Sequence, residues 1–94
     1  MRLVVTSAGI VRASETDCGR GLVGWVTVAI NDCLLIDGIT LRRARSGNFR
    51  LSYPARTDRQ GRKHSIVRPL TDADRIAIEK QVFTHLGISD GGLQ

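Results

Sequence analysis

The first thing this sequence lacks is a long apolar segment. No run of apolar residues approaches the length that spans a bilayer, and the opening stretch MRLVVTSAG has no long apolar core of the kind found in signal peptides. The sequence therefore predicts a cytoplasmic protein that neither enters a membrane nor is secreted. A chain of 94 residues is also too short to divide into two hydrophobic cores, so we expect a single domain.

Reactive and metal-binding side chains are also scarce. The two cysteines, Cys18 and Cys33, match no metal-binding spacing and no CxxC motif, and the sequence has only two histidines. It contains no Gly-rich phosphate loop followed by Lys-Ser or Lys-Thr, and no ordered Ser-His-Asp set. We therefore expect reduced thiols without a role, no metal, no cofactor and no small-molecule substrate.

Acidic residues are nearly absent from one region of the chain. Between Arg42 and Arg68 a single acidic residue, Asp58, stands against nine basic residues, so this segment carries a net charge of +8. The rest of the chain has five basic and eight acidic residues, which is a net charge of −3. The nine candidate binding residues are Arg42, Arg43, Arg45, Arg50, Arg56, Arg59, Arg62, Lys63 and Arg68.

Such a segregated positive charge indicates a polyanionic partner. Nucleic acid is favoured over a membrane surface, because no amphipathic helix accompanies the basic residues. Eight of the nine basic residues are Arg, whose planar group of donors suits phosphate. The alternative is a solvated basic face that only aids solubility.

The pattern along the chain predicts strands first and a helix last. Alternating apolar residues, bounded by turn signals such as Asn31-Asp32 and Gly47, are typical of antiparallel strands. The expected strands are at residues 2–12, 22–31, 33–43, 48–53 and 62–68, with loops at 13–21 and 54–61.

The helix is predicted to begin after Thr71, a residue suited to an N-cap, and to end at Gly87. An apolar stripe is expected to pack on one face of the sheet. Residues 88–94 are expected to form a flexible C-terminal tail. The predicted stripe is Ile76, Val82, Phe83 and Leu86, flanked by Ile78 and interrupted by Arg75 and Glu79.

The few aromatic residues divide by the alternation of the strands. Phe49 and Tyr53 share a face with Leu51 and are expected in the core, whereas Trp25 falls on the face opposite Val26. Aromatic side chains are candidate stacking platforms for single-stranded nucleic acid. The helix carries three acidic residues against two basic ones, so base readout by this helix is not expected. Binding is expected to be mainly to phosphates and only weakly specific for sequence.

The stretch from residue 22 to residue 87 carries a family resemblance. Its most specific part is a Pro after a strand, a basic residue, a turn with Gly, and a strand that closes in Ile and Pro before a helix. On this pattern, and on GWVTVAINDCLLIDGITL followed by NFRLSYP, the chain resembles the SpoVG family of bacterial septation and sporulation regulators. The positions that match are Pro54, Arg56, Gly61, Ile66 and Pro69.

The resemblance implies an α+β fold, in which a curved antiparallel sheet of about five strands is followed by a C-terminal helix in one domain at residues 1–87. It also implies a homodimer that binds DNA, with RNA as an alternative, and that takes part in transcription regulation and cell division. Arg56 matches the basic position that the family has after the first Pro. Thr57 stands where a second basic residue is frequent, and Arg68 stands where the family has His.

A dimer is also expected from the size of the chain. One chain offers one copy of the basic loop, and a two-fold dimer would place two copies on one surface. The expected interface is a strand edge between Leu22 and Leu41, where apolar residues alternate with little charge.

Two other function classes remain open at this point. His64 with Arg56, Arg68 and Tyr53 would suit a small metal-free ribonuclease, in which His is the general base and Arg holds the phosphate. No second acid or base stands at a forced spacing, so we do not expect an enzyme. The other class is a protein-interaction module without nucleic acid, since exposed strand edges readily pair with other chains.

Overall fold

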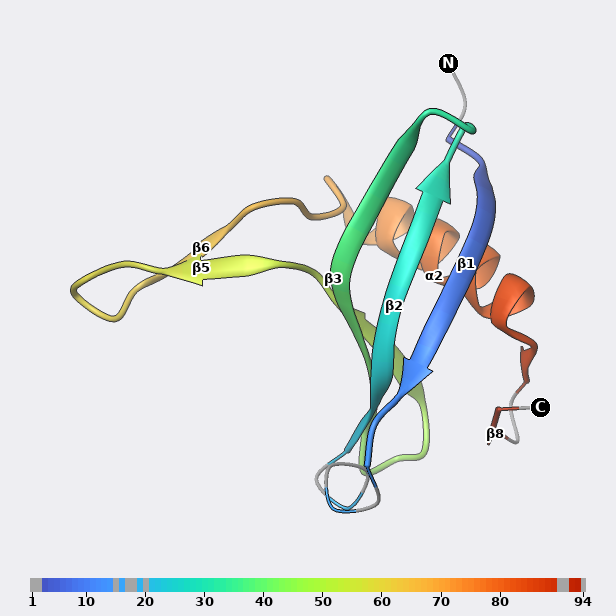
Figure 1. The fold of residues 1–94 in the computed structure, drawn as a ribbon, viewed down its shortest axis with the longest axis horizontal. Helices are drawn as coiled ribbons and strands as arrows, with labels where there is room; N and C mark the ends of the chain where they lie inside the picture. Colours follow the sequence, from blue (N-terminus) through green and yellow to red (C-terminus); the bar gives the residue numbers. More distant parts are fainter. Residues whose placement is uncertain (1–2, 15, 17–18, 20, 90–91, 94) are drawn as a thin grey trace.

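A four-stranded antiparallel sheet crossed on one face by a single long helix forms the body of the protein (Figure 1). The computed structural model describes residues 3–14, 16, 19, 21–89 and 92–93. The predicted α+β fold with a C-terminal helix is confirmed. The sheet has the order β1-β2-β3-β4, with β1 at Val5–Arg12, β2 at Leu22–Ile30, β3 at Leu34–Arg43 and β4 at Phe49–Ser52, and the helix α2 spans Asp72–Leu86.

Tight turns join the last three strands of the sheet. Asn31 and Asp32 both have positive φ, at 52° and 54°, which is the backbone that a tight turn between twisted antiparallel strands requires. Gly47, at φ 91°, serves the turn between β3 and β4. A register shift between Val26 and Val28 marks a bulge in the pairing of β2 with β3. Bulges bend a strand, and β3 is visibly curved in Figure 1, so the predicted curved sheet is confirmed.

The core lies between the inner face of the sheet and α2. Strand alternation places one set of apolar residues on this face, and Val82 of the helix is fully buried against them. Phe49 and Tyr53 are half-buried against the core, as predicted. The buried apolar residues are Val5, Val26, Val28, Ile30, Ile39, Leu41, Leu51 and Val82.

Both predicted helix caps are confirmed. The Thr71 side chain accepts a hydrogen bond from the backbone N–H of Asp74, and Gly87 closes the helix in the left-handed conformation. The predicted apolar stripe is wrong in one residue, because Ile76 is 57% exposed. Glu79 lies instead on the buried face, together with Val82.

Polar side chains of α2 bond to strands at both edges of the sheet. Oε2 of Glu79 accepts a hydrogen bond of 3.0 Å from the backbone N–H of Leu51 in β4. At the other edge, Oε1 of Gln81 accepts from the N–H of Val5 at 2.8 Å, and Nε2 of His85 lies 2.7 Å from the Val5 carbonyl oxygen. His85 therefore contacts β1 through its imidazole ring.

The predicted fifth strand is shorter than expected and does not join the main sheet. β4 follows the edge of β3 as far as Ser52, which is opposite Thr40, and the ring of Pro54 then approaches Gly38. Pro has no N–H to continue a ladder, and the chain leaves the body as a separate ribbon (Figure 1). The ribbon pairs β5, Ala55–Thr57, with β6, Lys63–Ser65. The loop predicted at 54–61 therefore contains a strand, which its short and polar sequence concealed.

Two segments, the loop after β1 and the stretch after α2, are described only in part. Four residues of the loop predicted at 13–21, at positions 15, 17, 18 and 20, lie outside the described residues, and Cys18 is among them. Beyond α2, the two-residue strands β7, Ile88–Ser89, and β8, Gly92–Leu93, pair with each other. The flexible tail at 88–94 stays a prediction.

Candidate nucleic-acid interface

The fold divides the basic segment into two groups at separate places. The first group lies where β3 and β4 meet, around the turn after β3. The second group lies on the projecting ribbon of β5 and β6, to the left of the body in Figure 1. The first group is Arg42, Arg43, Arg45 and Arg50, the second is Arg56, Arg59, Arg62 and Lys63, and Arg68 lies between the ribbon and α2.

The turn of the ribbon is organised by Asp58. Its Oδ1 accepts hydrogen bonds of 2.9 Å from the backbone N–H groups of Gln60 and Arg62. Its Oδ2 lies 3.2 Å from Nε of Arg62 and 2.7 Å from Nε2 of His64. Gly61 completes the turn at φ 81°, in the left-handed region that favours glycine.

These contacts determine the charge state of Asp58. The side-chain hydrogen bond with His64 is the largest cause that holds the pKa of the Asp58 carboxyl below its usual value, followed by the backbone N–H of Arg62. Asp58 is therefore a carboxylate at neutral pH. Its negative charge serves the turn, Arg62 and His64.

Three cations of the ribbon remain available for a ligand. Arg56, Arg59 and Lys63 are exposed and make no ion pair within the described part of the chain. In the register of the ribbon, Arg56 is directly opposite His64 and Thr57 is directly opposite Lys63. Because side chains alternate along a strand, these two rows lie on different faces of the ribbon. A polyanion can approach this ribbon from either face, because nothing in its two strands is buried.

The group at the end of β3 is organised differently. The guanidinium of Arg43 lies 4.9 Å from the centroid of the Phe49 ring, a cation–π contact on the inner face. Phe49 in turn meets Phe83 of α2 edge to face, with 6.5 Å between ring centroids. Arg42 and Arg50 are directly opposite each other on the outer face. All three arginines are exposed, but Arg43 packs on Phe49, whereas Arg42 and Arg50 lie on the outer face.

Comparison with known proteins agrees with the pattern in the sequence. No protein-family model matches the chain. Three curated proteins named "Putative septation protein SpoVG" are similar to it over 79 residues, which is 84% of this chain. They are those of Borrelia hermsii (strain HS1 / DAH), 29% identical over 81% of its length, Borreliella burgdorferi (strain ZS7), 27% over 80%, and Borreliella afzelii (strain PKo), 25% over 80%.

The chain resembles SpoVG proteins. The resemblance predicted from the sequence is thereby confirmed. The positions that carried it flank the ribbon of this SpoVG-like chain, since Pro54 stands where the chain leaves the body and Pro69 where it returns to α2. Arg56 is on β5 and Gly61 is in the turn. The SpoVG-like pattern therefore describes the ribbon and its two attachments.

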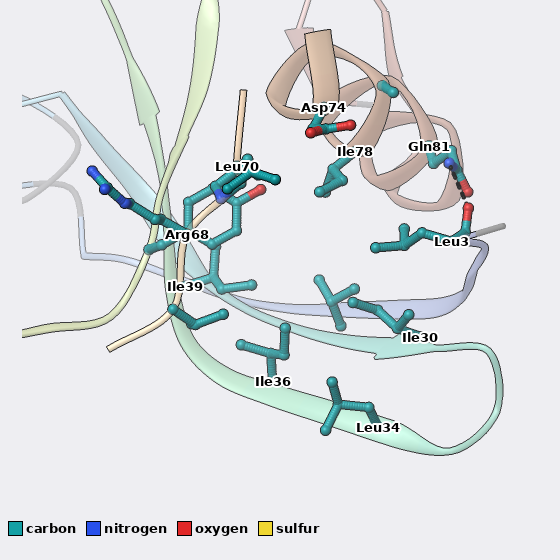
Figure 2. Close-up of a pocket in the computed structure, with 15 residues that line it drawn as sticks. Leu3, Ile30, Leu34, Ile36, Ile39, Arg68, Leu70, Asp74, Ile78 and Gln81 are labelled. Atoms are coloured by element: carbon teal, nitrogen blue, oxygen red, sulfur yellow. Dashed lines mark hydrogen bonds between the residues drawn. The ribbon is translucent and has the colours of Figure 1, made fainter. Parts of the chain in front are cut away.

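An apolar cavity of about 530 Å³ adjoins the base of the ribbon (Figure 2). It opens between the inner face of β3 and the first turns of α2. Arg68 is at its margin, with the guanidinium pointing away from Ile30 and Ile78 in Figure 2. Its apolar lining includes Leu34, Ile36, Ile39, Leu70 and Ile78.

Tyr53 also lines this cavity, and its hydroxyl group is buried. The Tyr53 hydroxyl has no hydrogen-bond partner among the described residues. Burial, and secondarily the negative charge of Glu79, raises the pKa of Tyr53 to about 12. Tyr53 is therefore neutral at physiological pH and packs against the core, and it adds no charge to the ribbon.

The ribonuclease hypothesis gains one partner, which lies outside the cavity. Asp58 supplies the acid partner for His64 that the sequence did not reveal, and an Asp-x-x-Gly turn pattern is the signal that would have suggested it. The pair lies on an exposed ribbon rather than in the cavity. Within the described ranges no group of three or more His, Cys, Asp or Glu residues is arranged to hold a metal ion, and no helix is long and apolar enough to cross a bilayer.

Proposed function

We propose that this chain is a SpoVG-like regulatory protein that binds DNA, and RNA as a second ligand, through phosphate contacts. The observation that carries the proposal is the projecting ribbon, on which Arg56, Arg59 and Lys63 are exposed and have no ion-pair partner among the described residues, while the nearby Asp58 carboxylate is engaged in the turn. Cations that have no acidic partner in the protein gain the most from a polyanion, because the ligand releases its counterions on binding.

Phosphate contact, rather than base readout, follows from the shape of the basic region. The only long helix of the described chain carries Asp72 and Asp74 in its first turn, so its N-terminal end repels a phosphate backbone. The ribbon instead offers exposed cations. Contacts of this kind position a protein on nucleic acid without selecting a sequence, so we expect site-tolerant binding.

The biological role is proposed from the similar proteins. Their printed name refers to septation, and we extend that role to this chain as a regulator of cell division and gene expression. A role in sporulation rests on the family resemblance alone.

We also propose that the protein acts as a homodimer. The predicted interface included β2, but β2 pairs with β1 on one side and with β3 on the other, so it has no free edge. β4 pairs with β3 only from Thr40 to Arg43. The edge of β3 near Leu34 and Leu35 is therefore open, and both side chains are exposed, which supports pairing with a second copy there. Light scattering at micromolar concentration should report about twice the chain mass.

The test of the binding proposal compares two lysines. Lys63→Ala removes an exposed cation from the ribbon, and Lys80→Ala removes an exposed cation from α2. We expect Lys63→Ala to weaken DNA binding and to reduce the salt slope of log K by about 0.9, with Lys80→Ala unchanged. The triple variant Arg56→Ala, Arg59→Ala, Lys63→Ala should lose most affinity. Affinity that is independent of salt, or equal for the triple variant and the wild type, would overturn the proposal.

The same experiment separates the other function classes. RNA should remain intact, and His64→Ala should leave binding nearly unchanged. RNA cleavage that disappears in His64→Ala would establish the ribonuclease hypothesis instead. A protein that binds neither DNA nor RNA would favour an interaction module.

A further inference from the structure

The outer face of the sheet is not covered by any described element. α2 crosses the inner face, and in Figure 1 it lies behind the strands. The strand register aligns one row of residues across the outer face, perpendicular to the strands. This row is Val11 of β1, Trp25 of β2, Thr40 of β3 and Ser52 of β4.

Trp25 stands in the middle of this row and is 44% exposed. It lies on a central strand, between two β neighbours, so its backbone is held rigidly. Its neighbours Val26 and Gly24 face the core and are buried. A large aromatic side chain on a rigid, uncovered sheet presents a flat surface to solvent, which is the arrangement on which bases stack.

Two arginines stand beside this surface. Leu41 and Leu51 are paired and buried on the inner face, so their neighbours Arg42 and Arg50 point outward and are directly opposite each other. Like charges directly opposite in a sheet destabilise it. Neither arginine makes an ion pair with any residue that the structure describes. The fold therefore gains nothing from this pair, whereas a phosphate between the two guanidinium groups would relieve their repulsion.

The two features are close enough for one ligand. Trp25 is directly opposite Thr40, and Arg42 follows Thr40 by two residues on the same face. Two residues advance a strand by about 7 Å, which long side chains easily span. A base on the indole ring and an adjoining phosphate on the arginines therefore fit the same patch.

We propose that this outer face is a binding site for single-stranded nucleic acid, with Trp25 as the stacking platform and Arg42 and Arg50 as the phosphate contacts. The proposal rests on the proposed function and specifies its ligand. In a duplex the faces of the bases are stacked on one another, so an aromatic side chain on an open sheet reaches only unpaired bases. The ribbon contacts phosphates of either form, and the sheet selects the single strand.

The experiment uses the fluorescence of Trp25, which is the only tryptophan in the chain. The full-length protein is titrated with oligothymidylate, with polyuridylate and with a DNA duplex, while binding is followed separately by anisotropy of a labelled oligonucleotide. We expect saturable quenching with both single strands, at the concentrations where binding occurs. The duplex should bind through the ribbon without comparable quenching.

Variants on the outer face sharpen the test. Trp25→Ala should weaken single-strand binding on the order of 10- to 100-fold and leave duplex binding unchanged, and Trp25→Phe should restore part of the loss. Val11→Ala is the matched control, since Val11 is an exposed apolar residue of the same row. Arg42→Ala combined with Arg50→Ala should weaken single-strand binding while leaving thermal stability equal or higher.

The outcomes distinguish this inference from the proposed function. If single strands bind with the expected salt dependence but Trp25→Ala binds them as tightly as wild type, the platform is wrong and the ribbon proposal stands. If equal quenching occurs with duplex, selection of single strands by the sheet is wrong. If no nucleic acid binds at any low salt concentration, both proposals are wrong.

Discussion

The ribbon of β5 and β6 and the body of sheet and helix are stabilised by different interactions. In the body, Leu41 is completely buried and its partner Leu51 is nearly so, beneath Val82 of α2. In the ribbon, every residue of both three-residue strands is exposed. Burial of apolar surface therefore stabilises the body, whereas backbone pairing and the Asp58 contacts hold the ribbon.

This difference explains where function can reside. Residues in a packed core are constrained by volume, whereas exposed residues of the ribbon can change with little effect on folding. A concentration of arginine is therefore compatible with the ribbon, as long as the turn is maintained. Four predictions test this contrast between body and ribbon.

The largest effect is expected for Leu41→Ala. The substitution leaves a cavity in the centre of the inner face, so the free energy of unfolding should fall by about 2–5 kcal/mol. Arg56→Ala, in the ribbon, should change it by no more than about 0.5 kcal/mol. Urea denaturation of both variants checks the prediction. Similar losses for the two would mean that the ribbon is part of the cooperative core.

Glu79 is expected to be the most important polar residue of the body. Its carboxylate accepts from the Leu51 N–H and lies 2.8 Å from Nη1 of Arg75. Glu79→Ala removes the acceptor of the Leu51 N–H and of Arg75. The free energy of unfolding should therefore fall by about 1–3 kcal/mol.

Glu79→Gln is the control for this effect, because an amide oxygen still accepts from Leu51 while the charge opposite Arg75 is lost. Glu79→Gln should lower the free energy of unfolding less than Glu79→Ala does. If both variants are as stable as wild type, the hydrogen bond from α2 to β4 contributes nothing to folding.

Titration of the Tyr53 hydroxyl reports on the core, because burial and Glu79 raise its pKa, Arg75 lowers it, and neither residue lies on the ribbon. It is the only tyrosine, so alkaline difference absorbance reports it alone, and its midpoint should lie near pH 12 rather than near 10. Because the pKa of Tyr53 is raised in the folded protein, its contribution to the free energy of unfolding is fully present below about pH 10. This contribution is lost as pH rises towards 12. A midpoint near 10 in the folded protein would show that the hydroxyl is solvated.

The smallest global effect is expected for Asp58. The folded pKa of Asp58 is lowered, so its contribution to the ribbon is present above about pH 4 and is lost as pH falls through the folded pKa. Asp58→Ala, which removes the acceptor of the Arg62 N–H, should accelerate amide exchange at Arg62 and leave the unfolding midpoint of the body unchanged. Amide exchange followed by NMR checks this, and a change spread over the sheet would contradict the separation of ribbon and body.

Local features of the fold were predictable from the sequence. The caps at Thr71 and Gly87, the turn at Asn31-Asp32 and the four strands of the main sheet depend on interactions between neighbours in the chain. The exposed Ile76 and buried Glu79 were not predictable in this way. A helix stripe shows which residues share a face, but the contacts with β4 decide how that face is rotated against the sheet.

The sequence by itself determined that positive charge is concentrated between Arg42 and Arg68, because charge depends only on composition. Only the tertiary structure decided how those charges are divided and which remain available. The departure of the chain near Pro54 separates the ribbon from the end of β3, and the turn engages Asp58 with Arg62 and His64. Likewise, alternation placed Trp25 opposite the core, but only the packing of α2 on the other face leaves it exposed. These outcomes depend on contacts between distant residues, which no local pattern contains.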